Sequence, residues 1–543
     1  MPCLSRAPAA PAVFSTLALA TAALIASGLP AAADAPQPLS GPSPFATCKL
    51  KGEKGKNYLN AVVEPWVDVN PTDPKHLVAA WQQDRWSNGG SRGIMSAYST
   101  DGGVNWLRVV VPRINKCSGG QGEFAYNRVS DPWTAISPNR TTYLMSLAFT
   151  DPVGKKPGAN AMLVSRSTDG GATWGDPTVL RRDTDPEIFN DKNAITADPT
   201  DSRYVYAVWD QLKGGVDADG GGDASSVAGA PDGYPDGEVI ARERMRAKMS
   251  ARAKGLRPAA EPTFFGPTFF ARTTDAGQTW ETAKVIHDPG ANAQTIANQA
   301  VVLNNGNVLV FFTEIPETGP IKIRFIKSTD HGASFGPPAD AAVINGTSSG
   351  TVTPDLKKPV RDGSILFDVA QDRNNDRLYL TWQDTGGSNV ERIAFAMSSD
   401  NGATWSSPMI INKTPNNADQ YRNQAFVPSV AVDAASRVVV TYYDFRNDPP
   451  RSRNMELTDY WAVVCTPSQA DCRSAAGWGS EKRLTPISFN MLNAPNARGL
   501  FVGDYQGLVS QVTSPRAVFG ITTKRNQSSI VTVPIALPEP PPQ

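Results

Sequence analysis

The stretch STDGGVNW at residues 99–106 decides the fold of this chain, because the same pattern returns four more times. The pattern is Ser/Thr-x-Asp-x-Gly-x-x-Trp/Phe, and its other copies are STDGGATW (167–174), TTDAGQTW (273–280), STDHGASF (328–335) and SSDNGATW (398–405). Its acids are Asp101, Asp169, Asp275, Asp330 and Asp400. Five copies of one motif predict an array of similar supersecondary units.

Each copy predicts a tight turn between two strands. The Asp side chain can accept hydrogen bonds from backbone N–H groups just downstream, and the Gly supplies a backbone conformation that other residues avoid. The terminal aromatic can pack under the neighbouring hairpin. We therefore interpret the five acids as structural.

Runs rich in Val, Tyr and Trp flank the motif, for example WVDVNP (66–71) and HLVAAWQ (76–82) before the first copy. Such runs, bounded by Asn, Asp, Pro and Gly, predict strands joined by hairpins. Two further units begin near residues 429 and 507, and the last has three strands, so we expect a strand at residues 58–63 to complete it. Radial repetition protects sheet edges, which predicts an all-β β-propeller of four-stranded antiparallel blades, with seven blades favoured and six as the alternative.

The N-terminus is typical of a signal peptide at residues 1–33, with Arg6, an apolar stretch at 12–26 and small residues before Asp34. We expect a Pro-rich segment at 34–50, one propeller at 51–536 with an insertion at about 212–262, and a Pro-rich tail at 537–543. Both Pro-rich ends are interpreted as spacers. The prediction is an exported protein, periplasmic or secreted.

Charge and hydropathy exclude two classes of partner. The chain has 52 basic and 52 acidic residues, so it has no global field to recruit nucleic acid or an acidic membrane. Beyond the signal peptide, no apolar run approaches the roughly 20 residues that span a bilayer. We expect a monomer.

Cysteine usage supports export. Removal of the signal peptide leaves Cys48, Cys117, Cys465 and Cys472, an even number in a compartment that permits disulfides. Cys465 and Cys472 occupy the place of a sixth motif turn and are predicted to pair, which leaves Cys48 with Cys117.

Metal binding is the rival interpretation of the cysteines, but their spacing matches no common zinc site and the chain has three His. No cofactor is expected. Asp217, Asp219 and Asp223 hint at calcium, although the further ligands of a calcium loop are missing.

The repeated motif resembles the Asp box, and nearly the whole mature chain resembles the sialidase-like, Asp-box (BNR) repeat β-propellers. This resemblance implies an exported sialidase-like glycoside hydrolase, an exo-alpha-sialidase-like enzyme, whose partner is a carbohydrate. Active sites of the family lie on the face opposite the Asp boxes, where first strands begin and second strands end. Residues of this chain at those points are Asp84, Arg85, Arg128, Asp131, Asp191, Lys192, Glu314, Arg361, Asp362, Asp384, Tyr421, Arg422, Asp444, Arg446, Asp504 and Tyr505.

The resemblance also implies roles. A sialidase holds the carboxylate of its substrate with three arginines, which would be Arg85, Arg128 and Arg446. A Tyr activated by a Glu is the nucleophile, which would be Tyr505 with Glu314, and an Asp is the acid/base, which would be Asp131 or Asp84.

The chain departs from the family where sialidases carry an Arg-Ile-Pro-type motif ahead of the first Asp box. The nearest string, PRIN at 112–115, follows that box. Another sugar, cleaved by two carboxylates alone, is therefore an open alternative to sialic acid. Because fold does not fix function, a non-catalytic glycan- or protein-binding propeller and an envelope scaffold or assembly factor also stay open. Arginines converging on a Tyr–Glu pair would favour the enzyme, whereas arginines paired within their own blades would favour the other two.

Overall fold

The computed structural model describes residues 35–51, 53–150, 158–185, 188–213, 265–346, 350–416, 419–451, 454–479, 481–511 and 514–537. The predicted signal peptide lies outside these ranges. Residues 214–264, which include most of the predicted insertion with Asp217, Asp219 and Asp223, and residues 538–543 also lie outside them. The described chain on either side of residues 214–264 places the insertion site between the second and third strands of its sheet.

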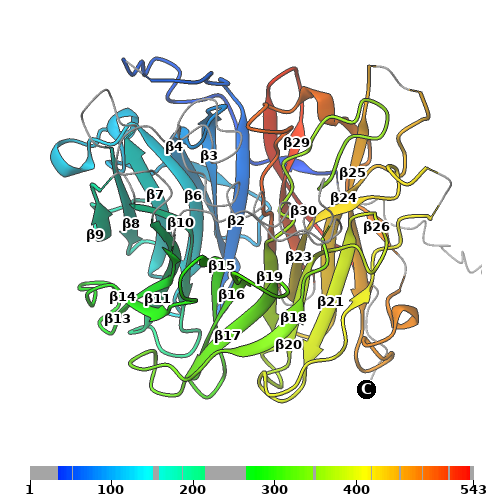
Figure 1. Cartoon of the computed structure of the whole chain (residues 1–543). Coiled ribbons are helices and arrows are strands. Elements are labelled where there is room, and N and C mark those ends of the chain that lie inside the picture. Colours follow the sequence, from blue (N-terminus) through cyan, green and yellow to red (C-terminus); the bar gives the residue numbers. More distant parts are fainter. Residues whose placement is uncertain are drawn as a thin grey trace, which may run out of the picture. The chain divides into compact units, whose positions relative to one another are not determined.

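The described chain is all-β, and its strands form five hydrogen-bonded sheets (Figure 1). Two of these sheets each join two successive antiparallel meanders, through β4 with β6 and through β12 with β15, so we divide the strands into seven meanders and number them as sheets 1 to 7. Sheet 1 contains β2 (Val62–Asn70), β3 (Asp73–Arg85), β4 (Ser91–Ser99) and β5 (Leu107–Val110), and sheet 2 contains β6 (Arg128–Ile136), β7 (Thr142–Thr150), β8 (Ala159–Ser167) and β9 (Thr178–Asp183). Sheet 3 contains β10 (Ile188–Ala197), β11 (Val205–Lys213), β13 (Thr268–Thr273) and β14 (Lys284–His287), and sheet 4 contains β15 (Ala293–Val302), β16 (Val308–Ile315), β17 (Lys322–Ser328) and β18 (Ala339–Val343). The short β12 (Phe265–Gly266) pairs with both β11 and β15.

The remaining strands follow the same order. Sheet 5 contains β19 (Phe367–Gln371), β20 (Leu378–Asp384), β21 (Arg392–Ser398) and β22 (Met409–Ile410), and sheet 6 contains β23 (Ala425–Val432), β24 (Val438–Asp444), β25 (Leu457–Cys465), β26 (Lys482–Arg483) and the short β27 (Phe489–Asn490). Sheet 7 contains β28 (Gly507–Val509), β29 (Arg516–Thr522), β30 (Ser528–Pro534) and β1 (Gln37–Pro38). Helix in the described part is limited to four single turns of 3-10 type, η1 (Lys116–Ser118), η2 (Gly122–Phe124), η3 (Ala475–Gly477) and η4 (Met491–Asn493), and no described helix is long and apolar enough to cross a membrane.

The first strands of the seven sheets contact one another in succession. β2 contacts β6, β6 contacts β10, β10 contacts β15, β15 contacts β19, β19 contacts β23, β23 contacts β28, and β28 contacts β2. Every first strand therefore has two other first strands beside it, and residues at corresponding points of adjacent first strands are brought together.

Sheet 7 is completed by an N-terminal strand, but not by the one that the sequence predicts. Gln37 lies opposite Thr532 in the pairing of β1 with β30, whereas Val62 and Val63 belong to sheet 1. Leu39 is buried and anchors this strand. The interpretation of the first Pro-rich segment as a spacer was therefore wrong for residues 37–38, where Pro is tolerated because β1 is an edge strand.

The five motif copies form the same turn between the third and fourth strands of sheets 1 to 5. The Ser or Thr hydroxyl donates to the Asp carboxylate at 2.7 to 2.8 Å and accepts the Gly N–H at 2.7 to 2.9 Å. The Asp carboxylate also accepts a hydrogen bond from the backbone N–H of the residue four positions after it. An example is the 2.8 Å bond from Thr173 N to Asp169. In sheet 6 the Cys465–Cys472 disulfide takes the place of this turn, and Cys48 pairs with Cys117, so both predicted disulfides are confirmed.

Candidate functional site

The first strands of sheets 1, 2 and 3 are interrupted at the same point by a bulge. The bulges lie between Val63 and Trp66, Ser130 and Trp133, and Asp191 and Ala194. Inside them, three charged residues adopt left-handed backbone conformations, and these are Glu64 (φ 53°), Asp131 (φ 52°) and Lys192 (φ 42°). A non-Gly residue held in this region costs on the order of 1–3 kcal/mol, and such residues concentrate at functional sites.

Two other sheets show that the bulge belongs to the fold while the charge does not. Ala297 in β15 and Val427 in β23 occupy the same kind of bulge with φ of 63° and 52°. Charged side chains at this position are therefore a particular property of the adjacent sheets 1, 2 and 3.

The three charged residues join a group that we call the central cluster, which consists of Glu64, Arg85, Asp131, Lys192, Arg361 and Asp504. All six are buried. Lys192 Nζ lies 2.9 Å from Asp504 Oδ2 and 3.8 Å from Glu64 Oε1. Arg361 binds Asp504 through two nitrogens, at 3.1 Å from Nε and 2.8 Å from Nη2.

Two uncharged side chains connect the remaining members of the central cluster. Gln82 donates its amide to Glu64 and to Ser130 Oγ, and accepts a 2.7 Å hydrogen bond from Arg85 Nη1. Ser130 Oγ in turn donates to Asp131 Oδ1 at 2.8 Å. One hydrogen-bonded network thus spans sheets 1 and 2.

Burial sets the protonation of two groups here. Desolvation, reinforced by the charge of Asp131, raises the pKa of Glu64 well above its usual value. Desolvation, reinforced by Glu64, also raises the pKa of Tyr505 well above 10. Glu64 therefore favours its neutral form, and the Tyr505 phenol is not activated toward phenolate.

A cavity of about 30 Å³ lies beside the central cluster. Asp131 lines it, and among the described residues Asp131 Oδ2 has no hydrogen-bond partner although it is buried. The other lining residues are Arg85, Asn88, Gly89, Gly90, Ser130, Leu147, Phe149, Phe189, Asp191, Lys192 and Arg361. This volume holds one or two water molecules.

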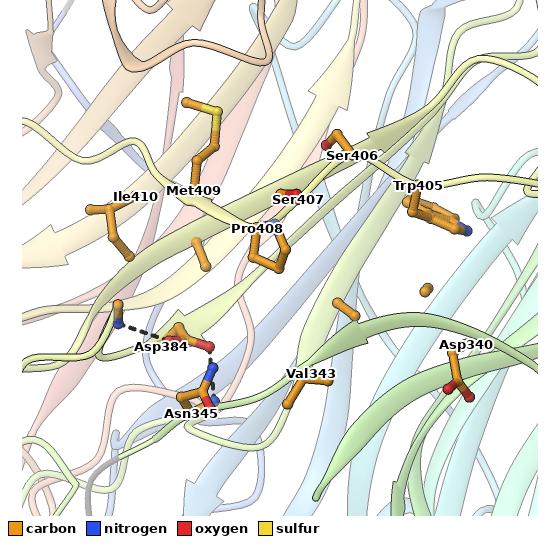
Figure 2. Close-up of a pocket in the computed structure, with 14 residues that line it drawn as sticks. Asp340, Val343, Asn345, Asp384, Trp405, Ser406, Ser407, Pro408, Met409 and Ile410 are labelled. Atoms are coloured by element: carbon orange, nitrogen blue, oxygen red, sulfur yellow. Dashed lines mark hydrogen bonds between the residues drawn. The ribbon is translucent and has the colours of Figure 1, made fainter.

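A larger cavity of about 710 Å³ lies apart from these residues, between β18 of sheet 4 and the segment that leads into β22 of sheet 5 (Figure 2). Its two carboxylates are already engaged. Asp384 accepts hydrogen bonds from the backbone of Asn345 and Gly386, and Asp340 pairs with Lys322 and Arg324. We therefore place the candidate site at the central cluster, where Asp131 Oδ2 is buried and has no hydrogen-bond partner among the described residues.

Three of the residues to which the sequence resemblance gives catalytic or substrate-binding roles come together. Arg85 and Asp131 belong to the central cluster, and Tyr505 lies next to it. The Tyr505 ring is 5.3 Å from that of Trp133, its hydroxyl donates to Pro132 O at 3.4 Å, and Lys192 Nζ is 5.8 Å from its centre.

The predicted nucleophile pair does not form. Glu314 binds His287 Nε2 at 2.7 Å and Arg324 Nη1 at 2.8 Å, and within the described ranges it makes no contact with Tyr505. The prediction was wrong because Glu314 links the fourth strand of sheet 3 to sheet 4. Glu64, rather than Glu314, is the glutamate close enough to Tyr505 to influence its pKa.

The predicted cluster of three arginines does not form either. Arg128 is buried against Glu53, at 2.7 Å, and donates to Asn88 and to Gly89 O. Arg446 is bound within sheet 6 by Asp444 and Glu481.

Asp84, the other acid/base candidate, holds the N-terminal segment. Its carboxylate accepts hydrogen bonds from Ser43 Oγ at 2.5 Å and from Asn60 N at 2.8 Å. Asp84 is thus a structural residue in this protein.

Sequence reasoning did not single out Glu64, and it assigned no role to Lys192, Arg361 or Asp504. A signal for Glu64 exists, because Glu64-Pro65-Trp66 and Asp131-Pro132-Trp133 repeat an acid-Pro-Trp pattern at corresponding positions of β2 and β6. The two Trp rings stack at 3.4 Å.

In the described part of the chain, no group of three or more His, Cys, Asp or Glu side chains could hold a metal ion.

No protein-family model matches the chain. It is 24% identical over 285 residues to a sialidase of Micromonospora viridifaciens, a match that covers 46% of this chain and 41% of that enzyme. The match thus spans less than half the length of that relative.

Similar solved structures include the NanB sialidase of Streptococcus pneumoniae, with a TM-score of 0.41 at 10% identity over 89% of this chain and 94% of that chain. Another is the alpha-L-arabinanase of Penicillium chrysogenum, with a TM-score of 0.42 at 12% identity over 76% of this chain and 94% of that chain. At these scores and identities, the structures carry no inference about activity.

Proposed function

We propose that the seven sheets are the blades of a β-propeller and that the protein is an exported glycoside hydrolase of sialidase-like type. The successive contacts of seven first strands, with β28 against β2, support the blade count. Two disulfides support an oxidising compartment. Similarity to a sialidase supports a glycosidic substrate.

One observation carries the proposed activity. Three adjacent first strands present Glu64, Asp131 and Lys192 at the same bulge, in a backbone conformation that side chains rarely adopt. Strain concentrated on buried charged groups is typical of a catalytic centre rather than of a stabilising core. Asp131, which lines the cavity with an unpartnered oxygen among the described residues, is the proposed catalytic carboxylate.

The arrangement favours carboxylate chemistry over a tyrosine nucleophile, because burial makes Tyr505 hard to ionise. It also offers a different cationic set from the predicted one, namely Arg85, Lys192 and Arg361. Asp504 already binds Lys192 and Arg361, so an anionic sugar would have to compete with that carboxylate. A neutral sugar is therefore as well suited to this site as sialic acid.

A second function, glycan binding without turnover, is favoured by the small volume of the cavity and by the pairing of Arg128 and Arg446 with nearby acids. In that case the central cluster would stabilise the sheets and glycans would bind at another surface.

The test is to incubate the purified chain from residue 34 onward with a mixed glycan library and to identify released sugars by mass spectrometry. The matched variant is Asp131→Asn, which retains an acceptor for Ser130 Oγ. We expect wild-type protein to release a sugar and the variant to lose about 10²–10⁴-fold in kcat at an unchanged melting temperature. Release of sialic acid would make Lys192 and Arg361 the next residues to replace. Binding without release would overturn the hydrolase in favour of the binding protein.

A further inference from the structure

Two more Asp residues, one lining the cavity and one fully buried, lie opposite each other on neighbouring strands. Asp191 of β10 and Asp210 of β11 are direct partners in the antiparallel register. Directly opposed residues carry their side chains on the same face of a sheet, with Cβ atoms about 4.5–5.5 Å apart. Asp191 lines the cavity with Asp131, whereas Asp210 is fully buried.

No described cation forms an ion pair with Asp210, although the charge of nearby Lys192 acts on it. Within the described ranges its carboxylate receives one side-chain hydrogen bond, from Asn298 Nδ2 to Oδ1 at 3.3 Å, and Oδ2 has no partner. Asn298 is held in turn by Thr268, whose hydroxyl donates to Asn298 Oδ1 at 2.9 Å. The amide nitrogen of Asn298 is therefore directed to Oδ1 of Asp210. Oδ2 of Asp210 is left as the oxygen that can carry a proton.

The charged groups around Asp210 come from two strands. β10 supplies Asp191 and Lys192, and β6 supplies Asp131. From β13 and β15 the neighbours are Thr268 and Asn298, which carry no charge. Lys192 is bound to Asp504. Burial first, and the charge of Asp191 second, raise the pKa of Asp210 well above its usual value.

We propose that Asp191 and Asp210 share one proton at neutral pH and that this pair is the general acid of the active site. Two carboxylates on directly opposed residues of a buried strand pair repel each other, which favours a proton on one of them. Asp191 is the catalytic member because it lines the cavity, and Asp210 is a positioning residue that keeps the proton on the pair. Glu64 does not line the cavity and is not the donor.

This inference rests on the proposed hydrolase and completes its chemistry. The glycosidic C–O bond breaks as the leaving oxygen takes the proton held by Asp191. Water forms the new bond to the anomeric carbon, and its proton passes to Asp131. One water is consumed, and solvent exchange returns the proton from Asp131 to the Asp191–Asp210 pair.

The first test needs no substrate. Infrared spectroscopy of the full mature chain, labelled with ¹³C at the Asp carboxyl carbons, should show at pH 7 a protonated-carboxyl band that weakens by one group in Asp210→Asn. The same loss is expected in Asp191→Asn if the proton belongs to the pair. An unchanged band in Asp210→Asn would overturn the shared proton whatever the enzyme activity.

The second test uses whichever glycan the library assay shows to be cleaved. In Asp210→Asn, the neutral amide no longer repels the charge of Asp191, so Asp191 ionises more easily. The alkaline limb of the kcat/KM profile should therefore move toward lower pH, to a proton concentration at least tenfold higher. The acid limb should stay where it is. The control is Asp68→Asn, which removes a buried carboxyl group outside the cavity. Because burial raises the pKa of Asp68 only to about 6, this variant should change the infrared band at pH 7 little and should move neither limb. A fixed alkaline limb in Asp210→Asn would overturn the general acid.

The two proposals fail separately. If the infrared band shows a shared proton but no glycan is cleaved, the proposed hydrolase activity is wrong and the proposed proton-sharing pair stands. If a glycan is cleaved but no shared proton is found, the hydrolase proposal stands and the proton-sharing pair is wrong.

Discussion

Buried ionic side chains have two different roles in this protein. Arg128, Arg446 and Asp84 are each enclosed by partners from their own or a neighbouring loop, and they fix the course of those loops. Asp131 and Asp210 each keep an oxygen that no described residue satisfies. A buried acceptor without a hydrogen-bond partner is destabilising. A position that retains such an acceptor therefore indicates a bound ligand, a bound proton or a catalytic role.

Arg446 provides a test of the first role. Arg446→Ala leaves Asp444 buried without the guanidinium that lowers its pKa, and breaking a buried pair costs about 3–5 kcal/mol. We expect urea denaturation to show a loss of this size. The matched control is Arg473→Ala, whose ion pair with Asp471 is exposed and should have no measurable effect.

An unchanged stability of Arg446→Ala combined with a loss of glycan cleavage would return Arg446 to the substrate-binding role that its position in the sequence suggests.

At the scale of elements, the same turn recurs where the sequence motif recurs, because every group in that turn is local. The Ser or Thr, the Asp and the Gly that form it lie within a few residues, so sequence spacing alone determines the hydrogen bonds. The bulges are local too, but the residue inside them varies from Glu64 to Val427, and no single motif marks them. The acid-Pro-Trp repeat was the available signal, and it covers two bulges.

The two disulfides should differ in their contribution to stability. Cys465 and Cys472 are separated by 7 residues, whereas Cys48 and Cys117 are separated by 69. Loop-closure entropy gives about 2.5 kcal/mol for the short loop and about 4.4 kcal/mol for the long one. The measurement is urea denaturation with and without reductant, on variants that each keep one disulfide, so that identical side chains are compared. Equal losses would show that strain or residual structure, rather than chain entropy, dominates.

At the scale of the whole molecule, buried carboxylates join neighbouring sheets. Asp68 of β2 accepts a 2.7 Å hydrogen bond from Ile136 N of β6, and Asp368 of β19 accepts a 2.8 Å bond from Val430 N of β23. The two residues occupy similar places between sheets 1 and 2 and between sheets 5 and 6. Both links form between first strands.

These links make stability depend on pH. Burial raises the pKa of Asp68 to about 6 and that of Asp368 to about 7, both above the usual 3.8. The folded state therefore binds more protons than the unfolded state between about pH 4 and 7, and the free energy of unfolding should fall as the pH rises through this window, by about 1.4 kcal/mol for each unit of raised pKa. Urea denaturation across this range should show the slope.

The control for this slope is the double variant Asp68→Asn/Asp368→Asn, in which the slope should become shallower. Asp444 and Glu481, whose pKa values burial raises to about 6 and about 7, should leave a remainder. A slope unchanged in the double variant would show that the two links do not titrate as proposed.

Much of the architecture could be predicted from sequence because it depends on local repetition, as the motif turns and the Cys465–Cys472 pair show. The site could be predicted only in part. Arg128, Arg446 and Glu314 lie at positions that the family resemblance marks. Each has a partner that is distant in sequence, namely Glu53, Glu481 and His287, and no local sequence pattern predicts these pairs. Long-range pairing decides whether a charged side chain is free for chemistry.

The pairing of β1 with β30 has a consequence for the order of folding. A chain synthesised from its N-terminus must keep Gln37 and Pro38 unpaired until residues 528–534 have been made. Sheet 7 is then the last sheet to be completed. The pairing of β1 with β30 closes a loop of almost the entire chain, and this closure has a large entropic cost. Until that moment β30 presents an open edge, which a second nascent copy could occupy by donating its own residues 37–38.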